Sequence, residues 1–176
     1  PTLGGPVKFF APPDLPAPNQ DLAVLARSLG QFSTTLNQFG EFYGQEQKRK
    51  QEVAAKKAAW MMHNAKLGSH PYLTGKGFPE GKGYVYDGLL LIPMRVGKSL
   101  VGCQTIDQQG GKKFLYGQQT KGAQLICDNK GRHILCEGYA TALSVRRALM
   151  HQKMRYTIHV CFSAANMAEI AAWLPG

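Results

Sequence analysis

One acidic residue stands where a strand is expected to end and a helix to begin. Residues 134–144 read Ile-Leu-Cys-Glu-Gly-Tyr-Ala-Thr-Ala-Leu-Ser, so a short apolar run stops at Glu137 and a glycine follows. In open α/β sheets, ligands and metals bind at the carboxyl ends of strands. We therefore take Glu137 as a candidate metal ligand. The alternative is that Glu137 caps the following helix, because negative charge is favourable there.

Strands and helices alternate around Glu137. Apolar runs predict strands at 134–136 and 156–162, and one-sided apolar patterns predict helices at 139–150 and 166–173. This order implies a parallel sheet with right-handed crossovers.

The preceding segment, residues 60–122, holds twelve glycines and predicts short strands. We expect an antiparallel meander with strands at 89–94, 100–106 and 113–116 and a turn at 107–111. Pro93 indicates that the first of these strands is an edge strand or carries a bulge.

The N-terminal third has two further parts. Residues 1–18 contain six prolines, which predict an extended arm; its apolar patch at 7–10 could dock or be mobile. Residues 19–59 predict a helix capped by Asn19, with an apolar stripe close to a heptad seam and a basic end. The stripe consists of Leu22, Leu25, Leu29, Phe32, Leu36, Phe39 and Phe42 or Tyr43. Such a helix either docks or oligomerises through residues 19–43, or packs on its own domain.

The charge points to a polyanionic partner. The formal net charge is +10, and residues 60–176 hold 14 Lys/Arg against 6 Asp/Glu. A basic domain of this kind favours nucleic acid. The candidate nucleic-acid-binding residues are Lys112, Lys113, Lys121, Arg146, Arg147, Lys153 and Arg155. Bases could stack on Phe114 or Tyr116 beside the lysines, although Phe114 is expected in the core.

The four cysteines lack the spacing of a zinc site, so they predict free thiols in a reducing compartment. No apolar stretch has the length of a membrane span, and no signal peptide is visible. No phosphate-binding loop of the ATPase type occurs.

Three segments together resemble a known family. The motif Glu-Gly-Tyr-Ala-Thr-Ala at 137–142 resembles the glutamate motif of the Toprim domain of phage and plasmid DNA primases. The stretches around 70–77, 91–94, 104–106 and 112–115 resemble the segment that precedes this domain. Ser163–Met167 resembles the family's second strand-end motif, with Ala165 and Met167 in place of Gly and Leu. Residues 1–59 loosely resemble the start of phage internal virion (ejection) proteins.

The resemblance to Toprim primases implies a fold class and an activity. The expected fold is α/β: an incomplete Toprim-like parallel sheet with flanking helices, preceded by a small antiparallel β-rich segment and by an arm plus a long helix. The corresponding parts are 1–18, 19–59, 60–122 and 123–176. The implied activity is Mg²⁺-dependent nucleotidyl transfer in DNA replication, with Glu137 as the catalytic residue and single-stranded DNA as partner, in the cytoplasm of a bacterium or phage-infected cell.

One component of that chemistry is missing. The family's Asp-x-Asp pair is expected shortly after Pro175, and none occurs in the 176 residues. A lone carboxylate holds Mg²⁺ weakly. We therefore expect nucleic-acid binding with incomplete or vestigial primer synthesis, and little or no polymerase activity.

Two alternatives stay open. The first is a virion structural or ejection protein that assembles as a homo-oligomer through residues 19–43, without catalysis. The second is a fusion of unlike segments near 54–60. A steep salt dependence of DNA affinity would favour the nucleic-acid-binding function.

Overall fold

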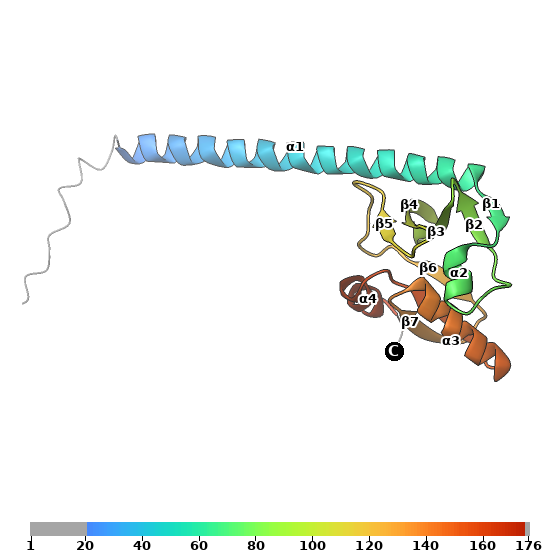
Figure 1. Ribbon diagram of the computed structural model, residues 1–176. Helices are drawn as coiled ribbons and strands as arrows, with labels where there is room; N and C mark the ends of the chain where they lie inside the picture. The colour runs from blue at the N-terminus through green and yellow to red at the C-terminus, as the bar shows by residue number, and fades with distance from the viewer. Residues whose placement is uncertain (1–20, 175–176) are drawn as a thin grey trace, which may run out of the picture. The chain divides into compact units, whose positions relative to one another are not determined.

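The computed structural model describes residues 21–174 (Figure 1). Contacts divide the chain into two units, Pro1–Gln45 and Glu46–Gly176. The described part of the first unit is the beginning of helix α1, which spans Asp21–Asn64. The Pro-rich arm expected at 1–18 and the helix cap expected at Asn19 lie outside the described residues.

Helix α1 is longer than the expected range of 19–59, and it passes through Gly30, Gly40 and Gly44 without interruption. Within the second unit it packs on its own domain, because Ala58 and Met61 are buried in a cluster with Leu91 and Cys103 of the first sheet. The alternative of a helix docked on its own domain is therefore correct for this part of α1.

The first sheet has five strands in the order β1-β2-β3-β4-β5, and every neighbouring pair is antiparallel. The bounds are Lys66–Gly68 for β1, Gly83–Tyr86 for β2, Leu89–Val96 for β3, Ser99–Ile106 for β4 and Lys112–Phe114 for β5. A five-residue helix, α2 (Pro71–Gly75), lies between β1 and β2 in the chain. The meander expected from β3 to β5 is thus confirmed.

Strand β3 is buried on both faces, which explains its unbroken apolar run. Alternate side chains of a strand point to opposite faces. Leu91 joins the cluster under α1, whereas Leu90 and Ile92 join a cluster with Tyr72 and Leu73. The prediction for Pro93 was an edge strand or a bulge. The edge strand was wrong, because β3 lies between β2 and β4, whereas the bulge agrees with the register shift between Met94 and Arg95. Strand β2 pairs with β3 only along Leu89–Leu91, so Pro93 interrupts no hydrogen bond to β2.

The second sheet has three strands in the order β6-β8-β7. Their bounds are Leu125–Asp128 for β6, Arg132–Cys136 for β7 and Tyr156–Val160 for β8. The expected parallel pair is present as β7 and β8. Strand β6 was not expected, and it pairs antiparallel to β8, so the sheet is mixed. The structure is therefore mixed α/β, with one antiparallel and one mixed sheet.

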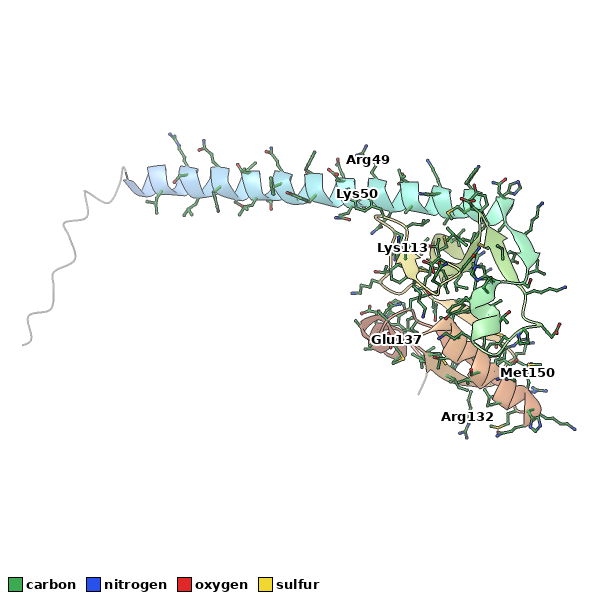
Figure 2. All side chains as sticks on the ribbon, in the orientation of Figure 1. Arg49, Lys50, Lys113, Arg132, Glu137 and Met150 are labelled. Carbon is green, nitrogen blue, oxygen red and sulfur yellow. The ribbon has the colours of Figure 1, made fainter. Side chains whose placement is uncertain are left out.

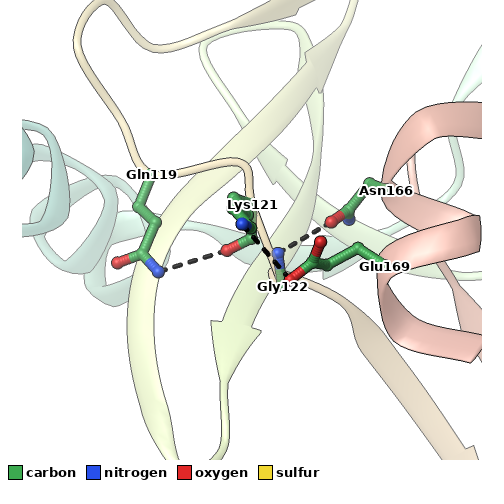
Figure 3. A network of polar contacts seen from close by, with 5 residues as sticks. All are labelled: Gln119, Lys121, Gly122, Asn166 and Glu169. Atoms are coloured by element: carbon green, nitrogen blue, oxygen red, sulfur yellow. Dashed lines mark hydrogen bonds and ion pairs between the residues drawn. The ribbon is translucent and has the colours of Figure 1, made fainter. Parts of the chain in front are cut away.

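Two helices follow the strands of the second sheet: α3 (Tyr139–His151) and α4 (Ala164–Ala171). Asn166, which is 7% exposed, holds the start of α4 in place (Figure 3). Its Oδ1 accepts a hydrogen bond from the Gly122 amide, and its Nδ2 donates to the Ala123 and Cys161 carbonyls, each at 2.7 Å. The same region carries an ion pair between Lys121 and Glu169 at 3.4 Å (Figure 3).

All four cysteines are free; Cys103, Cys136 and Cys161 are buried, and Cys127 is half-buried. Phe114, which was expected in the core, is 43% exposed at the end of β5, where its ring meets Phe162 edge-on. Among the described helices, none combines the length and the apolar run that crossing a bilayer requires.

Candidate nucleic-acid interface

A cavity of about 460 Å³ opens where α2, the β4–β5 turn and the beginning of α3 meet. Its volume lies in the range of ligand pockets. It is lined by Pro71, Tyr72, Gly75, Lys76, Gln108, Gln109, Gly110, Lys112, Gly138, Ala140 and Thr141. In the described part of the chain the lining holds two lysines and no acid, so the cavity suits an anion.

The wall formed by α2 is fixed by a buried histidine. The Nδ1 atom of His70 accepts the Tyr72 amide at 3.2 Å, and its Nε2 donates to the Gly88 carbonyl at 3.0 Å. His70 thereby ties α2 to the β2–β3 turn and orients Tyr72. The Tyr72 hydroxyl is buried without a hydrogen-bond partner in the described residues, which is uncommon for a buried polar group.

The opposite wall is the turn between β4 and β5. The Gly111 amide donates to Asp107 Oδ1 at 2.7 Å, and the Asp107 amide donates to the Gly111 carbonyl at 2.9 Å. Gly110 adopts a φ of +90°, which favours glycine. A Cβ there would lie 3.6 Å from the Tyr72 ring, so the turn fits closely against α2.

Two ammonium groups converge on one aromatic ring in this cavity. The Nζ atoms of Lys76 and Lys112 lie 5.8 and 5.9 Å from the centre of the Tyr72 ring. Both distances are within the range of cation–π attraction. Both ammonium groups thus lie beside the Tyr72 ring, which does not neutralise them.

The beginning of α3 adds a third source of positive potential. Its N-cap is Gly138, which offers no side-chain hydrogen bond, and no acidic residue lies in the first turn. A Cβ on Gly138 would lie 4.0 Å from Lys112 Nζ. Amides at a helix N-terminus favour anions, phosphate above all. The lysines and the helix end therefore act on the same space.

A second hollow of about 300 Å³ follows α3 on the side of the 78–82 loop. Arg147 stacks on Phe78 at 4.5 Å and donates from Nη1 to the Gly77 carbonyl at 2.9 Å. Arg146 donates from Nε to the Tyr156 hydroxyl at 3.2 Å, and this bond raises the pKa of the guanidinium. Both arginines, with Lys82, line this hollow.

The structure does not gather all the predicted basic residues. Lys113 follows Lys112 on β5, so it points to the other face of the strand. Lys121 is paired with Glu169. Lys153 and Arg155 lie beyond the end of α3 and are not among the residues that line the two hollows.

Glu137 lies directly between β7 and the N-cap of α3 (Figure 2). Its carbonyl accepts the Phe162 amide at 2.8 Å, and its side chain is exposed. The alternative that it caps α3 is not supported, because α3 has no side-chain cap. Within residues 21–174 no group of three or more His, Cys, Asp or Glu side chains gathers to hold a metal. Glu137 by itself does not fit a resident Mg²⁺, so we derive no metal-dependent step.

Lys76 and Tyr72 were not among the residues predicted from the sequence to bind nucleic acid. The segment around 70–77 was noted there only for its resemblance to the region before Toprim. The sequence therefore drew attention to this segment. It could not show that the segment meets β5 and α3, because that contact forms only in the tertiary structure. Comparison of the chain with known protein families, with curated proteins and with solved structures gave no match.

Proposed function

We propose that residues 46–176 bind single-stranded nucleic acid, with a backbone phosphate in the cavity of Lys76 and Lys112. The observation that carries the proposal is the convergence of these two lysines on the uncapped end of α3. The wider charge supports it, since the second unit holds 19 Lys/Arg against 8 Asp/Glu, a net +11. Phosphate contacts supply most of the affinity of sequence-independent binding.

The second hollow offers a continuation of the same binding surface along α3. Arg146 and Arg147 would contact the next phosphates, and the exposed rings of Phe114 and Tyr116 are available for stacking of bases. Single strands are favoured over duplex because stacking on a side chain requires an unpaired base.

As in the Toprim primases that it resembles, the chain would present Glu137 beside bound nucleic acid. The cavity borders Gly138, the next residue, so a phosphate there would lie near the carboxylate. A single carboxylate is too little for two-metal phosphoryl chemistry. The proposed function is therefore binding, with primer-synthesis chemistry incomplete in this chain.

The decisive experiment compares two pairs of substitutions with equal loss of charge. Lys76→Gln/Lys112→Gln removes the cavity lysines, whereas Lys66→Gln/Lys98→Gln removes two exposed lysines elsewhere on the first sheet. Affinity for a fluorescent single-stranded oligonucleotide is measured by anisotropy over a series of salt concentrations. Each lost phosphate contact lowers the slope of log K against log salt by about 0.7.

We expect the cavity pair to lower the slope by about 1.4 and the control pair to lower it much less. Equal effects of both pairs would show that binding follows net charge only, and the cavity would lose its role. If the unsubstituted protein binds no oligonucleotide at low salt, the proposed function is wrong.

A second candidate function is structural assembly, as in the virion proteins that residues 1–59 loosely resemble. The observation that favours it is the exposed apolar side of α1 between Leu25 and Tyr43. Under this function the salt series would show no specific role for the cavity.

A further inference from the structure

The first unit presents an apolar stripe on α1 that no described residue covers. Its members are Leu25, Leu29, Phe32, Leu36, Phe39 and Tyr43, and each is 55–65% exposed. They recur at alternating steps of 4, 3, 4, 3 and 4 residues, so each consecutive pair of steps spans seven residues, one heptad. A helix with this period forms a straight seam only when it supercoils with a partner helix.

The stripe is large enough for a specific interface. An aromatic side chain has about 150–250 Å² to bury, so one that is about 60% exposed leaves roughly 100 Å² uncovered. Three of the six residues are aromatic and three are leucines of slightly smaller area, so together they leave on the order of 600 Å² uncovered, the upper end for the largest apolar patch of a monomer. Two stripes facing each other would bury about 1,200 Å², where specific protein interfaces begin.

The helix itself requires a partner in order to persist. The helix contains Gly30, Gly40 and Gly44, and glycine is the poorest helix former after proline; a Cβ at any of them would touch nothing within 4 Å. Such a helix gains most of its stability from packing its apolar face. Nothing in the described residues packs on this face between Leu25 and Tyr43.

The charge distribution indicates what the partner is. If Leu29 and Leu36 take the a positions and Phe32 and Phe39 the d positions, the described e and g positions from 28 to 42 are Ser28, Ser33, Thr35, Gly40 and Phe42. None of these is charged, so two identical helices meet without repulsion and without needing a complementary partner.

Other occupants fit the helix less well. The charged residues of α1 before Gln45 are Asp21, Arg27 and Glu41, a net −1. A helix that lies in a membrane surface carries many Lys and Arg on its polar face, and nucleic acid requires a basic surface. Neither description applies to this segment.

We propose that residues 25–43 pair with the same residues of a second copy of this chain, as a left-handed coiled coil. The proposal does not depend on nucleic-acid binding by residues 46–176. Each copy contributes the same leucine and phenylalanine layers to a self-complementary seam.

The test is the mass of the full chain by sedimentation velocity and by light scattering, at tens of micromolar protein and high salt. High salt suppresses association through bound nucleic acid. We compare the unsubstituted protein, the seam variant Leu29→Glu/Leu36→Glu and the matched variant Gln31→Glu/Gln38→Glu. Both variants add two negative charges to the same helix, and Glu is as good a helix former as Leu or Gln.

We expect a mass of at least twice 19.3 kDa for the unsubstituted chain and for the matched variant, and 19.3 kDa for the seam variant. Thermal unfolding of the second unit, followed in all three proteins, is expected to coincide and thus to show that this unit remains folded. A monomeric unsubstituted chain overturns the proposal. So does an oligomer that survives in the seam variant, because another surface would then hold the copies together.

Discussion

Removing the Asn166 side chain is expected to destabilise the second unit strongly. Asn166→Ala deletes three hydrogen bonds of 2.7 Å in a buried site. It leaves without that partner the Gly122 amide (Figure 3) and the carbonyls of Ala123 and Cys161. Each buried polar group left unpaired costs at least about 1 kcal/mol, so the free energy of unfolding should fall by about 3 kcal/mol. That is a large part of the 5–15 kcal/mol typical of a domain.

The assay is equilibrium urea unfolding with calorimetry. A loss of about 3 kcal/mol should lower the melting temperature by roughly 10 °C in a unit of this size. The control is Asn129→Ala, because Asn129 is exposed and its side chain makes no hydrogen bond within the described residues. We expect the control to stay within about 0.5 kcal/mol of the unsubstituted protein.

Asn166→Asp tests whether the hydrogen bonds or the volume of the Asn166 side chain stabilises the second unit, because Asp has nearly the same volume but lacks the Nδ2 donor. The aspartate still accepts the Gly122 amide, but it places an anionic oxygen where the Nδ2 donor met two carbonyls. Its folded pKa should rise above the unfolded value, so the stability deficit should shrink as pH falls and the carboxyl takes up a proton. A loss below about 1 kcal/mol in Asn166→Ala would refute the reasoning, because relaxation or water would then have replaced the bonds.

Three further predictions test other features of the second unit. Gly131→Ala should lower the free energy of unfolding, measured by urea denaturation, by about 2–3 kcal/mol, because the added Cβ would meet the backbone of Arg155 and Tyr156. An unchanged free energy would show that the loop can move to accommodate the methyl group. Burial lowers the pKa of His159, so below about pH 6.5 the unfolded chain binds a proton that the folded chain does not, and the free energy of unfolding should fall as the pH drops. The dependence of this free energy on pH should be weaker in His159→Gln; an unchanged dependence would assign it to other groups. Burial raises the pKa of Cys161 to about 11, so this thiol should resist alkylation at pH 8 until denaturant is added. Mass spectrometry of the labelled peptides measures the alkylation, and rapid labelling of Cys161 in the native protein would contradict its burial.

Local patterns were sufficient to predict most of the elements. The continuous apolar run at Leu89–Ile92, the turn at Asp107–Gly111 and the alternation of strand and helix after Arg132 all appear near their predicted positions. These patterns depend on short-range rules: alternation along a strand, turn chemistry and the 3.6-residue period of a helix. Helix α1 was also predictable, although its end at Asn64 was not.

Strand β6 shows where local patterns were insufficient. Leu125–Asp128 is short and is half-exposed, so its own residues give little signal, and its place beside β8 depends on partners about thirty residues away. The same holds for Pro93, which suits a central strand only because β2 ends before it. Pairing partners, and therefore the mixed character of the second sheet, were decided by the tertiary structure.

The features of the candidate site likewise fall into two groups, those that the sequence predicts and those that depend on the tertiary structure. The sequence by itself determined that Glu137 ends a strand, that Gly138 and Tyr139 begin a helix and that the second unit is basic, because these are properties of neighbouring residues and of composition. Only the tertiary structure decided that Lys76 and Lys112, thirty-six positions apart, share a cavity with that helix end. The physical reason is that a site for an anion requires charges to converge in space, and convergence depends on how α2, β5 and α3 pack, which no single stretch of sequence specifies.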